Sequence, residues 1–274
     1  MSGGGEVGNL DYSVRNSTSS RAFSCTASVE GDYIKKTRGG GCGQAYGPPR
    51  QDRKTRERRQ AGDADTVRRS PSSFSRMNSV IGGIIRASCP ANSDRVPKFV
   101  TLTYASADAD LFCAKSDAKR FVDKLKRLYH GLDYLVILEP HELGDWHAHL
   151  VLLLPIGVSD VSKECVNDAW GHGSVRVSEV WNAHYLASYF NPFSPKKRSR
   201  QKYYPLGERT YFASQGMARP QKYSGLSLQQ VRDMTQDAQL IETRPFGPTG
   251  IDVGVQEFYL NDKGAHLNGE LPII

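Results

Sequence analysis

Two apolar segments separated by a short polar connection constrain the fold of this chain more than any other feature. Residues 134–140 (YLVILEP) and 146–155 (WHAHLVLLLP) have the length and composition of strands. The sequence HELGD between them contains Gly144 and Asp145, which allow a tight return. We therefore predict an antiparallel hairpin, and a chain of 274 residues is long enough to bury it in a core without disulfides or cofactors.

The second strand of this hairpin carries histidines at alternate positions, His147 and His149. Alternate side chains of a strand share a face, so both imidazoles should lie on one side while Ala148 turns into the packing beneath. Because the turn is centred near Leu143, Glu139 falls opposite His147, and cross-strand neighbours lie about 5 Å apart. The spacing predicts a cluster of two imidazoles and a carboxylate that is able to hold a metal ion, although these residue types do not name the metal.

The segments around the hairpin predict an α+β fold. Hydrophobic periodicity gives the order strand, helix, hairpin, helix, strand, helix. Ser116 is expected to cap the first helix and Gly131 to end it. This order is typical of a mainly antiparallel central sheet with helices packed on it. Outside the hairpin, the expected elements cover residues 96–104, 117–131, 161–170, 171–180 and 182–190.

The first part of the chain differs in composition from the rest. Up to about residue 75 it is rich in Gly, Ser and Arg with few aliphatic residues, and residues 50–59 are RQDRKTRERR. This composition predicts a largely disordered basic region, which is either a solvated linker or a non-specific phosphate-binding arm. The whole chain has 36 Lys and Arg against 29 Asp and Glu, which favours a polyanionic partner such as nucleic acid.

The cysteines and the hydropathy profile exclude several classes of protein. The five cysteines are scattered and include no CxxC pair, which supports neither a disulfide framework nor a zinc ribbon. No segment approaches the roughly 18 apolar residues of a membrane span, and no apolar run follows a basic start at the N-terminus. We expect a soluble protein of a reducing cytoplasm.

A pair of tyrosines, Tyr185 and Tyr189, follows the last expected strand. They are four residues apart without Gly or Pro between them, which places both phenols on one face of a helix. Tyrosine pairs at this spacing usually pack against a core. Near a divalent cation, however, a phenol is able to attack a phosphodiester while the cation polarises the scissile phosphate.

The order of the motifs FVTLTY, ILEPHELGDWHAHLVLLL, AWGHGSVRVSEV and HYLASYF resembles the replication-initiator endonucleases of the HUH superfamily. The likeness is strongest to those of small single-stranded DNA phages and related plasmids, and it covers about residues 97–192. It implies that His147 and His149 bind a metal and that Glu139 is the third ligand. We expect this metal to be Mg²⁺ or Mn²⁺.

The resemblance also implies covalent catalysis by Tyr185 and Tyr189. One tyrosine nicks single-stranded DNA at a replication origin and becomes linked to the 5′ phosphate, and the other serves a later transfer; we favour Tyr185 as the essential one. A host DNA polymerase would extend the free 3′ hydroxyl, and a host helicase is a further expected partner. The family usually has a lysine three residues after a tyrosine, but here Ser188 and Pro192 occupy those positions. We expect the missing charge and contacts to DNA to come from the basic residues that follow: Lys196, Lys197, Arg198 and Arg200.

These inferences divide the chain into a largely disordered basic region (1–95), a nicking endonuclease domain that depends on metal and tyrosine (96–195), and a basic segment with a C-terminal extension (196–274). Other functions remain open. A transposase or a relaxase would share the metal pair and the tyrosine while acting on different DNA ends. A catalytically inactive DNA-binding protein is the main alternative outside the enzymes. A metallohydrolase of small molecules would need further Asp or His ligands on later strands.

Overall fold

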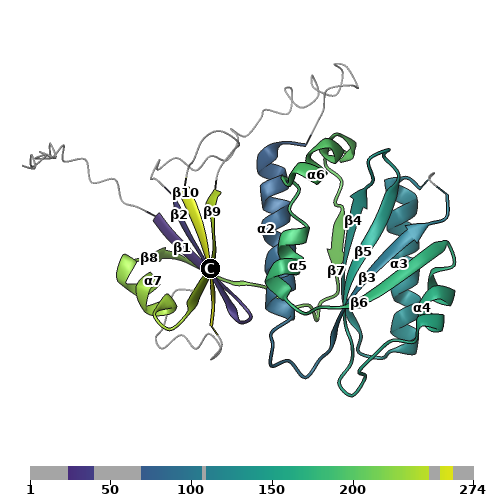
Figure 1. Cartoon of the computed structure of the whole chain (residues 1–274), viewed down its shortest axis with the longest axis horizontal. Helices are drawn as coiled ribbons and strands as arrows, with labels where there is room; N and C mark the ends of the chain where they lie inside the picture. Colours follow the sequence, from purple (N-terminus) through teal and green to yellow (C-terminus); the bar gives the residue numbers. More distant parts are fainter. Residues whose placement is uncertain (1–23, 40–68, 107–108, 247–253, 262–274) are drawn as a thin grey trace, which may run out of the picture.

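The computed structural model describes residues 24–39, 69–106, 109–246 and 254–261. In this part of the chain, two five-stranded antiparallel sheets and six α-helices form the predicted α+β architecture. Figure 1 shows the two sheets side by side, with helices α2 and α5 between them. None of the described helices combines the length and the apolar character that a membrane span requires.

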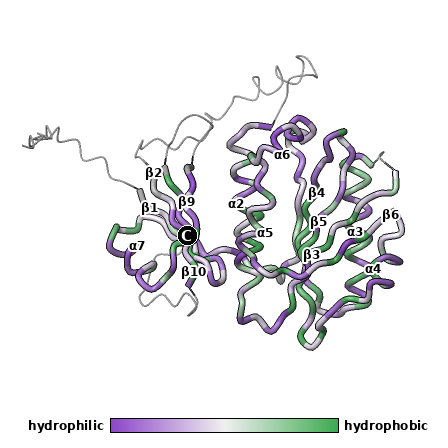
Figure 2. The backbone as a smooth tube through the Cα atoms, viewed as in Figure 1, coloured by the Kyte–Doolittle hydropathy of each residue, from purple (hydrophilic) through white to green (hydrophobic). Residues whose placement is uncertain are grey.

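The central sheet has the strand order β6-β3-β5-β4-β7. Its β4–β5 pair is the predicted hairpin, and all eight residues of β5 are buried because helices cover both faces of the sheet. In Figure 2, β4 and β5 are mostly hydrophobic, whereas α6 is hydrophilic. The strands are β3 (Pro97–Tyr104), β4 (Asp133–Pro140), β5 (Trp146–Leu153), β6 (Gly173–Glu179) and β7 (Tyr211–Ala213).

Helices lie on both faces of the central sheet (Figure 1). One face packs against α3 (Leu111–Leu128) and α4 (Lys163–Trp170), and the other against α2 (Pro71–Ser88) and α5 (Ala183–Tyr189). The predicted cap at Ser116 is wrong. The helix begins five residues earlier because the Asp110 carboxylate accepts the Cys113 N–H at 2.7 Å, and Ala114 and Ala118 continue the buried stripe toward that end.

The second sheet, with the order β8-β1-β2-β10-β9, joins segments from both ends of the described chain. One of its faces forms a small core with α7 (Leu228–Thr235), in which Ile34, Tyr223, Val231 and Met234 are buried. Short α6 (Pro195–Arg198) and the 3-10 helix η1 (Ser199–Tyr203) precede β7. The strands are β1 (Ser24–Glu30), β2 (Tyr33–Gly39), β8 (Gln221–Leu226), β9 (Gln239–Phe246) and β10 (Gly254–Leu260).

Within residues 1–95, which we predict to be largely disordered, the expectation fails at β1, β2 and α2. Helix α2 has the signals of an ordered helix: Ser70 accepts the Ser73 N–H at 3.2 Å, and Pro71 stands in the first turn. Strands β1 and β2 owe their order to pairing with β8 and β10, which local composition does not reveal. Residues 1–23 and 40–68, including the basic run, lie outside the described residues.

A candidate metal and tyrosine site

The hairpin register brings two histidines and a glutamate together on one face of the central sheet. Glu139 pairs with His147 across the β4–β5 ladder, and His149 lies two residues further along the same strand. One ligand atom from each of the three buried residues lies within 4.8 Å of the others. The Nε2 atoms of the two imidazoles are 2.9 Å apart, and His149 Nε2 is 3.5 Å from Glu139 Oε2. We call these three residues the ligand cluster, and its geometry is the one that the hairpin predicts.

Neighbouring charges set the protonation states in the ligand cluster. Burial raises the pKa of Glu139, but the hydrogen bond with His149 and the charge of Lys197 outweigh it and hold the pKa at about 2. Burial, together with the neighbouring His149 and His141, lowers the pKa of His147 to about 3. At neutral pH the cluster therefore combines an ionised carboxylate with a neutral imidazole, the forms in which these side chains bind metals.

Thr101 on β3 orients the second imidazole. It pairs with His149 in the β3–β5 ladder, and its Oγ1 lies 3.1 Å from His149 Nδ1. When Nδ1 donates to this hydroxyl oxygen, Nε2 keeps its lone pair for the cluster. Sequence reasoning missed Thr101, although it belongs to the FVTLTY motif, because the β3–β5 register is not visible in the sequence.

His147 has a nitrogen that no hydrogen bond satisfies. Among the described residues, its buried Nδ1 has no hydrogen-bond partner. The ring stacks on that of His141, with centroids 3.9 Å apart and an angle of 19° between the planes. His141 belongs to the turn of the hairpin, where we expected a solvated side chain, and it forms one wall of the site instead.

The two tyrosines of α5 differ in their distance from the ligand cluster. The Tyr189 ring meets His149 edge-on, with centroids 5.6 Å apart, and Phe99 at 6.1 Å. Its side chain is 45% exposed, whereas Tyr185, one helical turn earlier, is 77% exposed. Burial and the charge of Glu139 raise the pKa of Tyr189, so its phenol is protonated at neutral pH. The geometry favours Tyr189 over Tyr185 as the tyrosine beside the cluster.

The comparisons with known proteins agree with this site. Residues 97–194 match a family of replication-associated proteins, the ORF2 family. The match covers roughly a third of the chain, from β3 to the residue before α6, and we call it the replication-associated segment. Neither the curated proteins nor the solved structures gave a significant match.

The replication-associated segment contains the whole ligand cluster and both tyrosines, but its end excludes a fourth member of the site. Lys197 on α6 donates to both carboxylate oxygens of Glu139 at 2.8 Å. Its Nζ also lies 4.1 Å from the centroid of the Tyr189 ring. Predicted as a DNA contact, Lys197 instead links the carboxylate to the tyrosine, and this contact spans 58 residues of sequence.

The other three basic residues of the predicted DNA contact take different positions. Lys196 and Arg198 are exposed on α6. Arg200 is half-buried, with Nη2 3.7 Å from Glu142 Oε1, and its buried Nε has no hydrogen-bond partner among the described residues. Two of the four predicted residues thus remain open to solvent, and two turn toward the site and the hairpin turn.

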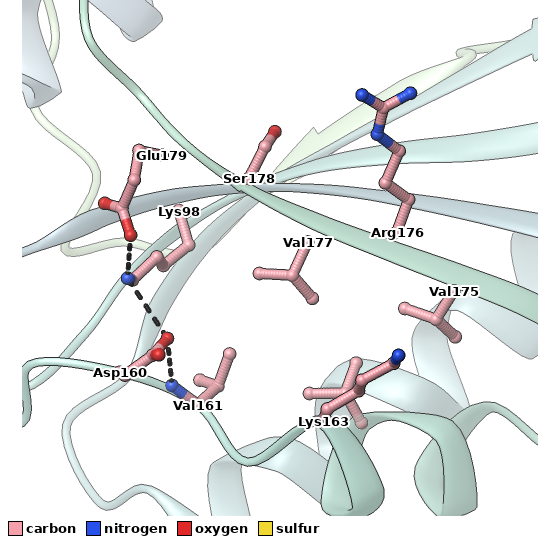
Figure 3. A pocket seen from close by; sticks show the side chains of 10 residues that line it. Lys98, Asp160, Val161, Lys163, Val175, Arg176, Val177, Ser178 and Glu179 are labelled. Carbon is pink, nitrogen blue, oxygen red and sulfur yellow. Dashed lines mark hydrogen bonds and ion pairs between the residues drawn. The ribbon is translucent and has the colours of Figure 1, made fainter.

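A separate hollow of about 380 Å³ lies beside β6, against α4 (Figure 3). The alternation of β3 places Lys98, which lines it, on the sheet face opposite Thr101. Lys98 pairs with Glu179 and, at 3.1 Å, with Asp160, so this buried ammonium is neutralised within the protein. The hollow is therefore distinct from the ligand cluster, and its charges are satisfied.

Proposed function

We propose that this chain is a rolling-circle replication initiator that nicks single-stranded origin DNA with a tyrosine. One observation carries the proposal: the Tyr189 ring lies against His149 of a buried cluster of two imidazoles and a carboxylate, in a segment similar to replication-associated proteins. A nucleophile and a cation site supply complementary parts of phosphodiester cleavage.

The donor set of the ligand cluster fits a divalent cation. Glu139 contributes a carboxylate that its surroundings keep ionised, His147 a neutral imidazole, and His149 a ring oriented by Thr101. When bound, the cation polarises the scissile phosphate and stabilises the charge that develops on it. We propose Mg²⁺ or Mn²⁺, and because imidazole also suits Zn²⁺, the choice of metal is part of the proposal.

We assign the first cleavage to Tyr189 because of its contact with the ligand cluster. Its phenolic oxygen forms a bond to the phosphorus, and the bond from phosphorus to the 3′ oxygen breaks. The products are a 5′ phosphotyrosine and a free 3′ hydroxyl, which takes up the proton that the phenol gives up. The ammonium of Lys197 over the ring favours the phenolate, and so replaces the charge that the absent lysines after each tyrosine would supply.

The remaining roles follow from this assignment. Tyr185, exposed one turn away on the same helix, would accept the strand in the second transfer. The free 3′ hydroxyl would prime a host DNA polymerase, with a host helicase separating the strands in the host cytoplasm. Lys196 and Arg198 would contact phosphates of the origin strand.

The test is formation of a covalent link between protein and DNA. Labelled single-stranded circular DNA carrying the origin is incubated with the protein and Mn²⁺ and separated on a denaturing protein gel. We expect a labelled band that depends on metal and is lost in Tyr189→Phe and His147→Ala. Tyr185→Phe should keep the first link and fail to release a closed circle. Tyr129→Phe, whose hydroxyl accepts the Ser162 N–H far from the site, is the matched control.

Two outcomes would contradict the proposal. Binding of origin DNA without a covalent band, with Mg²⁺, Mn²⁺ and Zn²⁺ all tried, would indicate a catalytically inactive DNA-binding protein. A band that persists in Tyr189→Phe and disappears in Tyr185→Phe would reverse the roles of the two tyrosines.

A further inference from the structure

Trp181 is an almost fully exposed tryptophan, 91% accessible, in the connection between β6 and α5. The protein has three tryptophans, and the other two, Trp146 and Trp170, are buried. A tryptophan offers one of the largest apolar surfaces of any side chain, about 150–250 Å² when buried. Isolated exposed apolar residues are common, so the position of Trp181 decides whether it matters.

The position of Trp181 connects it with the proposed active site. It precedes Asn182, which caps α5 by accepting the Tyr185 N–H at 2.8 Å. Exposed aromatic side chains therefore recur at residues 181, 185 and 189. Tyr185 and Tyr189 lie one turn apart, about 6 Å along the helix, and Tyr189 touches the ligand cluster. The series leads from the cluster to the beginning of the helix.

A free cation lies on the same face of the central sheet. Arg176 on β6 pairs with Thr101, which in turn pairs with His149, so these three residues lie side by side across three strands. Strand spacing puts the backbone of Arg176 roughly 10 Å from that of His149. Figure 3 shows Arg176 and Ser178 pointing away from the hollow that Val175 and Val177 face. Arg176 is exposed, and among the described residues it has no hydrogen-bond or ion-pair partner.

We propose that Trp181 stacks on a base of the single strand whose phosphate lies at the ligand cluster, and that Arg176 pairs with a phosphate of the same strand. This inference rests on the proposed function and names its substrate contacts. Aromatic platforms beside cations are the usual means of holding single strands, because every base offers a π-face and every nucleotide a phosphate. A base that is paired within a duplex does not offer its face to a side chain, so the surface selects single-stranded DNA.

Intrinsic tryptophan fluorescence gives a direct test. Because Trp146 and Trp170 are buried, stacking of a base should quench the emission of Trp181 alone. The protein is titrated with oligothymidylate in EDTA, so that binding is measured without cleavage. We expect quenching in the wild type and none in Trp181→Phe, which should retain most of the affinity because it keeps an aromatic ring. Trp181→Ala should weaken binding about 5- to 100-fold.

Two further variants separate the base contact from the phosphate contact. Arg176→Gln should weaken binding and lower the slope of log affinity against log salt by about 0.7, whereas Trp181→Ala should leave that slope unchanged. Leu143→Ala, at an exposed apolar residue in the turn of the hairpin, is the matched control and should bind as the wild type does.

The outcomes distinguish this inference from the proposed function. Wild-type affinity and unchanged emission in the presence of DNA for both Trp181 variants would overturn the stacking contact, even if the covalent band forms. Quenching with loss of affinity in Trp181→Ala, but no covalent band in the wild type, would support the single-strand surface and overturn the nicking activity.

Discussion

Two buried polar clusters lie beside helix α5, and they are built in opposite ways. Toward the central sheet, Glu139, His147 and His149 bring together three groups that offer lone pairs to one point. Toward the second sheet, each acid meets a base. Arg86 Nε on α2 donates to Glu30 Oε2 on β1 at 2.5 Å, and both side chains are buried.

The second of these clusters extends onto α5 through His184. Its Nε2 lies 2.6 Å from Glu242 Oε2 on β9, and Arg244 donates to the same oxygen at 2.8 Å. The imidazole also stacks with the Tyr33 ring of β2, with centroids 5.7 Å apart, and meets Phe258 of β10 at 5.0 Å. We call the charged and imidazole groups on this side the interface cluster: Glu30, Arg86, His184, Glu242 and Arg244.

The difference teaches which buried polar groups hold the fold and which are available for chemistry. Opposite charges in contact satisfy one another and fix the elements that carry them. Lone pairs gathered around one point are satisfied together only by a cation. Because His184 and Tyr189 lie on the same helix, the interface cluster holds the helix that presents the tyrosine to the ligand cluster. Breaking the first should cost stability, and breaking the second should cost metal binding and activity.

The largest effect is expected from His149→Ala. Loss of a ligand should weaken Mn²⁺ binding at least about 100-fold, more than the loss of an outer partner of a ligand, and abolish the covalent link to DNA. Calorimetric titration with Mn²⁺ in the absence of DNA measures the binding. His130→Ala, at an exposed histidine after α3, is the control. Unchanged Mn²⁺ affinity in His149→Ala would show that the ligand cluster is not the metal site.

The second largest effect is expected from Arg86→Ala. It leaves the buried Glu30 carboxylate without its main partner, so the free energy of unfolding should fall by about 3–5 kcal/mol. Urea denaturation measures the loss. Arg120→Ala removes an exposed ion pair with Asp117 and should cost less than about 1 kcal/mol. Equal losses in the two variants would contradict a structural role for the interface cluster.

The two clusters also differ in how far the sequence predicts them. The pairing of Glu139 with His147 follows from two apolar strands and a short turn, so the hairpin alone carries the information. Thr101 and His149 are 48 residues apart, and only the folded sheet sets their register. Lys197 reaches Glu139 because the chain turns back after α5, which no periodicity shows.

The interface cluster was invisible in the sequence for the same reason. Its members come from β1, α2, α5 and β9, and the sheet that joins them pairs the first described strands with the last. The short strands β1 and β2 lie in a part of the chain where Gly, Ser and Arg dominate the composition, which masks their alternation. Local patterns therefore predicted the central hairpin and the α+β class, but not the second sheet.

An intermediate effect is expected from Thr101→Val, which removes the hydroxyl beside His149 Nδ1 and keeps the side-chain shape. Without this partner the imidazole is free to rotate, and Mn²⁺ affinity should fall about 10- to 100-fold. Thr103→Val, on the same strand and the same face, is the matched control. If both variants bind Mn²⁺ as the wild type does, the hydroxyl has no part in orienting the ligand.

The smallest effect concerns the pH dependence that His184 gives to stability. Burial lowers the pKa of His184, and the charge of Arg86 adds to this, so that together they outweigh the Glu242 carboxylate. The unfolded chain therefore takes up a proton near pH 6.5, before the folded protein does. The contribution of His184 is fully present above about pH 6.5 and is lost as the pH falls toward the lower pKa of the folded state. A single proton limits this slope to about 1.4 kcal/mol per pH unit.

His184→Gln isolates this term because an amide still donates to Glu242 but does not titrate. Urea denaturation between about pH 7.5 and about pH 5 should give a shallower loss of stability in the variant than in the wild type. Glu242→Gln should act in the opposite direction, because it removes the carboxylate that raises the pKa of His184, and the wild-type loss should then continue to lower pH. Equal slopes in all three proteins would mean that His184 is solvated rather than held in the interface cluster. The second sheet would then not be what fixes the tyrosine helix.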